Sequence, residues 1–275
     1  MRVSHKLKMK KYLSFFKIRF LAGLQYRAAA WAGIATQFFW GAMTLLMFRA
    51  FYRTGADSFP MTFPELANYI WLQQAFLAMF MTWFYDNDIF DSITSGSISY
   101  ELCRPIRLYT MWFVKNMAIR LSRVVLRCLP ILILAVLLPA PFNLTPPPHL
   151  SSGLLALLSL MLGFLVLIAF NMLIYISAFY TLSAVGLKNI STTVMEFLSG
   201  AILPLPFFPS ALQPVLKVLP FASIQSTPFL IYSGHFEGAA LTAGLALQAV
   251  WLIVLLSVGW LLMQRALKKV VVQGG

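Results

Sequence analysis

Residues 128–187 read CLPILILAVLLPAPFNLTPPPHLSSGLLALLSLMLGFLVLIAFNMLIYISAFYTLSAVGL and contain no lysine, arginine, aspartate or glutamate. Two further runs, Ala28–Phe48 and Gly238–Gln264, also lack these residues. A helix needs about 20 apolar residues to cross the hydrocarbon core of a bilayer, which is about 30 Å thick. The pattern therefore predicts a polytopic integral membrane protein.

The composition supports this class and indicates one membrane-embedded unit. The chain has 275 residues, of which 60% are hydrophobic and 11% charged, whereas soluble domains carry about 25% charged residues. The net charge is +13, and residues 1–27 hold eight basic residues and no acid directly before the first apolar run. Positive residues beside spans mark the cytoplasmic side of a membrane, so we expect lipid contacts and no nucleic-acid partner.

We expect an all-α fold in which residues 28–275 form six spans and both termini are cytoplasmic. This orientation places eighteen basic residues on the cytoplasmic side and only Arg49, Arg53 and Lys217 outside, as the positive-inside rule requires. The expected spans are Ala28–Tyr52, Leu66–Tyr85, Trp112–Pro139, Gly153–Leu182, Asn189–Leu205 and Ala239–Gln264.

The basic tail before the first span has a helical pattern. An apolar stripe at helical spacing is formed by Met9, Tyr12, Leu13, Phe16, Phe20 and Leu24. Lys10, Lys11 and Lys17 lie away from it, although Phe15 and Ile18 break the pattern. A basic amphipathic helix is typical of an element that lies on the inner leaflet. The alternative is a mobile basic tail.

Two proline-dense segments fall on the expected outer side. Residues 139–148 contain five prolines and no charge, which is typical of a rigid turn. Residues 204–228 contain six prolines and cannot form one straight spanning helix. We expect this second segment to enter the outer leaflet and return, because irregular backbone at that depth must be buried in protein or line a cavity.

The sequence shows no catalytic or cofactor-binding motif. It has no phosphate-binding loop of the Gly-x-x-x-x-Gly-Lys-[Ser/Thr] type. His5, His149 and His235 are scattered, and Cys103 and Cys128 match no disulfide or metal pattern. We therefore expect no metal or cofactor on this chain. Energy for uphill transport would come from another chain or from an ion gradient.

The connection between the second and third expected spans is the richest polar segment. It holds half of the chain's acids, and Asp88 and Asp91 are placed to begin a short helix. The sequence around Gly96 predicts that this helix ends there. Arg104-Pro105 predicts the start of the next helix, because proline suits the first turn of a helix. Such a helix could dock a soluble partner, or the segment could be an ordinary solvated loop.

Several polar residues fall inside expected spans, where they are costly. Arg120, Arg123 and Arg127 share one helix face, where they could reach lipid head groups or line an inner vestibule. Glu196 is the only acid inside a span and could be a pathway or gating residue, or a hydrogen-bond anchor. Asn171 is more typical of an interhelical hydrogen bond than of a substrate contact.

The layout resembles a permease subunit of ABC-2-type transporters, and is most similar to bacterial permeases that are often encoded in pairs beside one ATPase gene. Two segments carry the resemblance: Ile93-Thr-Ser-Gly96…Glu101-Leu-Cys-Arg104-Pro105 and Leu198-Ser-Gly200-Ala-Ile-Leu-Pro204…Phe208-Pro209…Leu219-Pro220-Phe221. The resemblance implies the type-2 ABC exporter fold in the bacterial inner membrane. It also implies an export path between two six-span chains, identical or paralogous.

The same resemblance implies that ATP and Mg²⁺ bind to separate cytosolic ATPase subunits. The helix that couples to the ATPase would fall at about residues 86–104. Its candidate residues are Asp86, Asp88, Asp91, Gly96, Glu101, Arg104 and Pro105. The candidate pathway residues are Glu196, Asn171, Gly200 and Pro204.

Two other classes compete with this interpretation. A stand-alone secondary transporter or channel would use Glu196 as its ionisable site, although the inverted halves typical of that class are not evident. The other class is a membrane enzyme or a purely structural scaffold, and the lack of a polar catalytic cluster disfavours the enzyme. The apolar, aromatic interior suits amphipathic or lipid-like cargo better than sugars.

Overall fold

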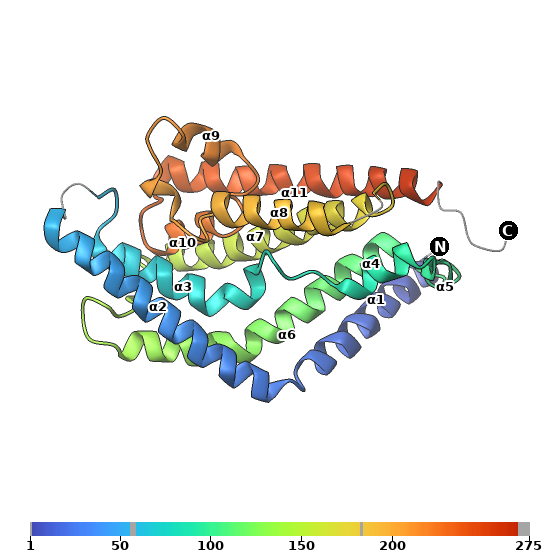
Figure 1. Ribbon diagram of the computed structural model, residues 1–275, viewed down its shortest axis with the longest axis horizontal. Coiled ribbons are helices and arrows are strands. Elements are labelled where there is room, and N and C mark those ends of the chain that lie inside the picture. Colours follow the sequence, from blue (N-terminus) through green and yellow to red (C-terminus); the bar gives the residue numbers. More distant parts are fainter. Residues whose placement is uncertain (1, 56–58, 182–183, 269–275) are drawn as a thin grey trace.

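The computed structural model describes residues 2–55, 59–181 and 184–268. This part of the chain is all-helical, with no strand. Most of the long helices run roughly along the long axis of the molecule, and the short helices gather toward its two ends (Figure 1). The elements are α1 (Arg2–Gly23), α2 (Arg27–Gly55), α3 (Phe63–Phe80), α4 (Asn87–Thr94), α5 (Ile98–Leu102), α6 (Leu108–Leu137), α7 (Leu150–Ser177), α8 (Ala184–Leu198), η2 (Leu205–Phe207), α9 (Gln213–Val218), α10 (Ser226–Tyr232) and α11 (Gly238–Leu267).

Helix α3 is the centre of the bundle and packs against α2, α6, α7 and α10. A Thr62–Glu65 capping box begins it. Its polar side chains bond to neighbouring segments: Asn68 Nδ2 donates to Thr145 Oγ1 at 2.8 Å, and Trp71 Nε1 donates to the Phe142 carbonyl at 2.7 Å. These bonds attach the proline-rich 139–148 turn to α3. A buried helix with bonded polar groups does not need a uniformly apolar sequence.

Helices α7 and α11 are joined by a buried amide. The Gln248 side chain, which is fully buried, donates to the carbonyls of Ser159 at 3.0 Å and Ser223 at 2.8 Å, and accepts from Ser159 Oγ. Gly163 of α7 allows a second close contact, with the segment before α10, because a Cβ atom there would lie 2.0 Å from the Ile224 carbonyl oxygen. Satisfied buried amides of this kind fix one arrangement of apolar helices.

The segment between α8 and α11 differs from the expected span Asn189–Leu205. Helix α8 ends at Leu198, and the chain turns at Gly200, whose φ of 84° is favourable only for glycine. The prolines that follow prevent the helix from continuing. The chain then forms η2, α9 and α10, and α10 is buried against α7 and α3. The helix break predicted from the prolines is therefore confirmed, whereas the predicted entry of this segment into the outer leaflet stays a prediction.

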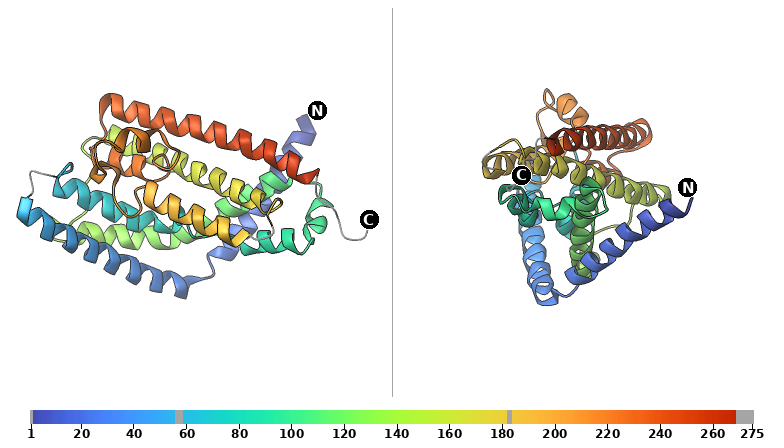
Figure 2. Two further views of the ribbon diagram at one scale, coloured as in Figure 1. Left: turned by 45° about the horizontal axis from the view of Figure 1, so that its top comes forward. Right: turned by 90° about the vertical axis from the view of Figure 1, so that its right-hand side faces the viewer.

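The N-terminal segment forms the helix α1, not a mobile tail. Figure 2 shows α1 crossing the bundle at an angle and meeting α2 at a sharp turn. It lies along the first half of α6, with Tyr12 beside Arg107 and Gly23 beside Ser122. Tyr12, Phe16 and Phe20 are partly buried in this contact, as the stripe predicts. Met9 and Leu13 belong to the same stripe but are 65% and 69% exposed, so the contacting face is narrower than expected.

Three helices of the described chain, α2, α7 and α11, are long and apolar enough to cross a membrane. The other three expected spans, α3, α6 and α8, do not meet these conditions. Helix α8 has 15 residues, and α6 carries one lysine and three arginines. The sequence and the fold therefore agree on a membrane protein, and directly support three of its six expected spans.

Candidate functional site

The polar segment between α3 and α6 forms a compact unit at one end of the molecule. Asp86 begins α4: its backbone is extended, and Oδ1 accepts a hydrogen bond from the Asp88 N–H at 3.2 Å. A carboxylate is well placed at a helix N-terminus, where N–H groups are unpaired and the helix dipole is positive. Asp88 lies in the first turn, and Asp91 lies further along α4. Asp86 is thus the cap, a role predicted for Asp88 or Asp91.

A buried ion pair holds this cap to α6. Lys115 Nζ lies 2.6 Å from Asp86 Oδ2 and 3.1 Å from Asp88 Oδ2. The Lys115 and Asp86 side chains are 9% and 7% exposed, whereas that of Asp88 is 80% exposed. Charges that are removed from water need a close opposite charge and further hydrogen bonds. Both conditions hold, because the Asp86 carboxylate also accepts from the Asp88 N–H. The Asp86 backbone N–H donates separately to Tyr175 Oη on α7 at 2.7 Å.

Aromatic contacts extend the attachment to α7. Phe90 of α4 packs on Tyr175 with ring centroids 5.1 Å apart, and Ile89 is buried beside it. Tyr175 Oη donates to Asn116 Oδ1 at 3.3 Å, which returns the network to α6. The apolar side of α4 therefore faces the bundle, and the helix cannot move without α6 and α7.

Helix α5 is tied to α6 by a separate bond. Gly96, with φ of 74°, makes the predicted break between α4 and α5. Glu101 Oε2 then accepts from Trp112 Nε1 at 2.9 Å. The predicted restart at Pro105 is wrong: Arg104 and Pro105 lie in an exposed, non-helical link, and α6 begins at Leu108. The chain needs these residues to turn from α5 into α6.

The outer side of this unit is exposed and polar. Asn87, Asp88, Asp91 and Thr94 line the exposed side of α4, and Tyr100 of α5 is 76% exposed. The start of α1 and the end of α11 lie at the same end of the molecule (Figure 1). The arrangement is a small acidic face held on a rigid base, which is suited to bind a soluble partner with basic or polar groups.

Arg120 has a different role from either one predicted for it. Its guanidinium donates to the carbonyls of Met79 at 3.0 Å, Met81 at 2.7 Å and Phe84 at 2.8 Å, and the residue is fully buried. The last carbonyls of a helix have no partner within the helix. Arg120 therefore caps the C-terminus of α3, and reaches neither a head group nor a vestibule.

Of the other two arginines on that face, Arg123 shares the Phe84 ring with Arg120, and Arg127 contacts α2. The Arg123 guanidinium lies 3.9 Å from the centroid of the Phe84 ring, a cation–π contact. Arg127 donates to the Ala29 carbonyl at 3.4 Å and lies against Gly33 of α2. The three residues share a helix face as predicted, but they join α6 to two different neighbours.

The candidate pathway residues lie on α7, on α8 and just after α8. Thr82 Oγ1 donates to Glu196 Oε1 at 3.1 Å, so Glu196 joins α8 to the end of α3 and is partly exposed. The Gly200 carbonyl accepts from Tyr69 Oη at 2.9 Å. Pro204 precedes η2. Asn171 is fully buried, and neither amide atom has a partner in the described chain, which contradicts the predicted interhelical bond.

The residues that build the site were only partly found from the sequence. Lys115, Trp112 and Tyr175 are absent from the predicted set, although each binds a predicted acid or its backbone. The sequence offered one reason to include Lys115 in the predicted set, because a lysine in an apolar helix requires a partner. Nothing in the order of residues shows that this partner precedes it by 29 positions.

A family model described as "ABC-2 family transporter protein" matches residues 38–274. The chain belongs to the ABC-2 family of transporter proteins. It is therefore a membrane transport permease and not itself the ATPase. No curated protein matches the sequence. The family match spans the acidic unit and the Gly200 turn, the two segments that carry the resemblance in the sequence.

Proposed function

We propose that this ABC-2 permease is the membrane subunit of an ATP-driven exporter and works as a dimer with an identical or paralogous chain. Separate cytosolic ATPase subunits would bind ATP and Mg²⁺. The observation that carries the proposal is α4: a short capped helix whose acidic side is exposed at Asp88 and Asp91 and whose other side is fixed to α6 and α7. The acidic unit, residues 86–104, would be the coupling segment.

The contacts of α4 support a mechanism for coupling. ATP binding would bring the ATPase subunits together and push on α4. The force would pass to α6 through the Asp86–Lys115 pair and to α7 through Phe90 and Tyr175. The bond between Glu101 and Trp112 would move α5 with them. Short, buried contacts transmit displacement well because a packed interior is only slightly compressible.

We also propose six spans, with both termini in the cytoplasm of a bacterial cell and the chain in its inner membrane. The polar side chains that lower the hydropathy of α3 and α6 bond inside the protein, as Asn68, Gln73 and Arg120 do. The lipid would not have to accommodate these groups. Helix α8 is about 22 Å long at 1.5 Å per residue, and the buried segment after it would complete the fifth span. Residues 1–27 would lie on the inner leaflet.

The export path would follow the first, second and fifth spans, which are α2, α3 and α8. Glu196, Gly200 and Pro204 belong to α8 and to the turn that follows it, and Asn171 lies on α7. The buried, unpartnered Asn171 amide supports a role in this region, because unpaired buried polar groups are costly unless a function requires them. Amphipathic or lipid-like cargo is the class that we propose.

The test of coupling is a charge reversal on the free face of α4. Asp91→Lys should lower co-purification of the ATPase from native membranes and leave membrane insertion unchanged. Glu237→Lys is the matched control, because it makes the same charge change at an exposed position before α11, outside the coupling segment. Unchanged recovery of the ATPase with Asp91→Lys, or equal loss with Glu237→Lys, would contradict the proposed docking face.

The alternative is a stand-alone secondary transporter with Glu196 as its ionisable site. Both ion pairs of the described chain involve Lys115, so Glu196 has a hydroxyl partner and no cation within the described residues. Isolation of the chain without any ATPase would favour this alternative. Recovery of a subunit with a phosphate-binding loop would favour the exporter.

A further inference from the structure

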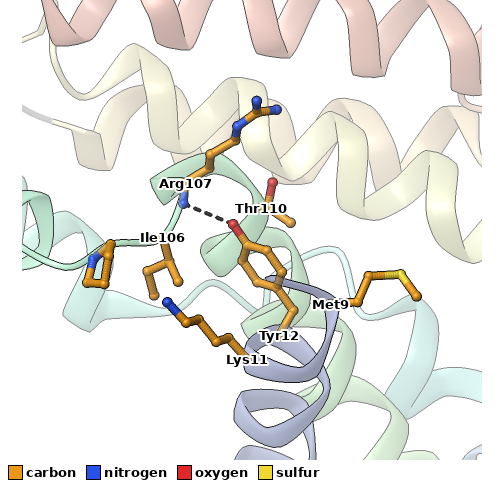
Figure 3. A pocket seen from close by; sticks show the side chains of 7 residues that line it. Met9, Lys11, Tyr12, Ile106, Arg107 and Thr110 are labelled. Atoms are coloured by element: carbon orange, nitrogen blue, oxygen red, sulfur yellow. Dashed lines mark hydrogen bonds between the residues drawn. The ribbon is translucent and has the colours of Figure 1, made fainter. Parts of the chain in front are cut away.

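Two hollows flank Tyr12 where α1 passes the link between α5 and α6. The larger has a volume of about 540 Å³ and is lined by Met9, Lys11, Tyr12, Pro105, Ile106, Arg107 and Thr110. Figure 3 shows Lys11 and Tyr12 entering it from α1, and Ile106 and Thr110 lining it from the link and α6, whereas the Arg107 guanidinium extends away from Lys11. The smaller hollow, of about 430 Å³, shares Lys11, Tyr12 and Ile106 with the larger one. The two hollows are neighbours that share these residues, and together they are called the groove along α1.

The larger hollow collects hydrogen-bond donors and positive charge. Tyr12 Oη accepts from the Arg107 N–H at 2.9 Å, so its own proton remains available to donate. The Thr110 hydroxyl and the side-chain nitrogens of Lys11 and Arg107 have no partner among the described residues. No described acid lines either hollow. Two cations and two hydroxyls without a carboxylate suit a phosphate group.

The smaller hollow adds an apolar surface. Phe15 and Ile18 line it together with Ile106. Ile18 is 65% exposed, as are Met9 at 65% and Leu13 at 69% on the same helix. Exposed apolar residues on a basic helix are typical of an element covered by lipid acyl chains. A small water-soluble phosphate would leave this surface uncovered.

We propose that the groove binds an anionic glycerophospholipid of the inner leaflet. Its phosphate would lie among Lys11, Tyr12 and Thr110, the Arg107 guanidinium would turn toward it, and an acyl chain would lie along Phe15 and Ile18. The bound lipid would join α1 to the link that follows the coupling segment, so the attachment of α1 would depend on the lipid. This site rests on the proposed placement of residues 1–27 on the inner leaflet, but it does not depend on the proposed export function.

Native mass spectrometry of the delipidated full-length chain tests the proposal. Palmitoyl-oleoyl phosphatidylglycerol should bind more tightly than the matching phosphatidylcholine, and inorganic phosphate and glycerol 3-phosphate should compete poorly. Lys11→Gln with Arg107→Gln should weaken phosphatidylglycerol binding about 30-fold, since each interfacial cation contributes about a 5-fold gain. Lys17→Gln with Arg27→Gln removes the same charge at exposed positions outside both hollows and should change binding much less.

Single variants keep the test valid if the double variant does not fold. Lys11 is exposed, so Lys11→Gln should fold and weaken binding about 5-fold, and Lys11→Arg should retain it. Equal weakening by the control pair would show diffuse attraction to a basic helix and overturn the proposal. Unchanged binding by Lys11→Gln, or competition by inorganic phosphate at the same concentration as the lipid, would also overturn it.

Discussion

The Lys115–Asp86 ion pair gives the sharpest prediction about the coupling segment. Lys115→Met keeps the length and packing of the side chain but leaves the Asp86 carboxylate, 7% exposed, without its cation at 2.6 Å. Removing one partner of a buried pair costs about 3–5 kcal/mol. The loss of stability should be local to α4, because Asp86 is the residue that caps this helix. We therefore expect α4 and α5 to detach locally while the bundle stays folded.

Neighbouring variants separate the buried pair from simple charge loss. Asp88→Asn removes an acid whose side chain is 80% exposed and 3.1 Å from the same lysine, so it should cost at most about 1 kcal/mol. The double variant Lys115→Met/Asp86→Asn removes both charges of the buried pair and keeps a good capping residue. It should recover about 2 kcal/mol or more of the single variant's loss, because contacting residues are not additive.

Hydrogen–deuterium exchange of the purified chain is the suitable assay, since local opening sets the exchange rate. Lys115→Met should accelerate exchange in residues 87–102 roughly 150-fold, which corresponds to a cost of about 3 kcal/mol. Peptides around Gln248, on the far helix pair, should not change. Unchanged exchange in residues 87–102, or an equal effect of Asp88→Asn, would refute the buried-pair interpretation.

Three further variants test the other polar contacts. Arg120→Lys should lower the free energy of unfolding by about 2–3 kcal/mol, because an ammonium lacks the planar fork of donors that reaches three carbonyls. The loss should appear as a lower thermal midpoint in detergent, and an unchanged midpoint would contradict the cap on α3. Gly200→Ala should destabilise the fold by about 1–3 kcal/mol, since φ is 84° and the added Cβ would lie 2.4 Å from Tyr69 Oη. The same loss in a Tyr69→Phe background would show that backbone strain, not the clash with Tyr69, sets the cost. Glu196→Gln keeps an acceptor for Thr82 and should alter transport in reconstituted vesicles without affecting assembly; loss of assembly would assign Glu196 a structural role.

For the three arginines of α6, helical spacing predicts the shared face but not the groups that each one contacts. Helical spacing places Arg120, Arg123 and Arg127 on one face, and the structure agrees. The predicted environment was wrong for Arg120, because the partners of its guanidinium are backbone carbonyls about forty positions earlier in the chain. Backbone carbonyls have no sequence signature. An arginine that caps another helix therefore looks, in the sequence, like one that reaches lipid.

The fifth expected span illustrates a different limit. Apolar residues continue past Leu198 toward Leu205, so hydropathy extends the span beyond the end of α8. The positive φ of Gly200 and the prolines from Pro204 onward end the helix earlier. Glycine permits this turn but does not require it. The Tyr69 bond to the Gly200 carbonyl is what selects it in the folded protein.

The sequence by itself determined the membrane class, the helical composition, the ABC-2 resemblance and the break at Gly96. These properties follow from local composition, charge placement and glycine or proline chemistry, which operate over neighbouring residues. Only the tertiary structure decided which acid caps α4, that Lys115 holds it, that Arg120 closes α3, and that α1 and the link after α5 enclose a groove. Each of these contacts joins residues far apart in the chain, and such pairings are set by the packing of whole helices.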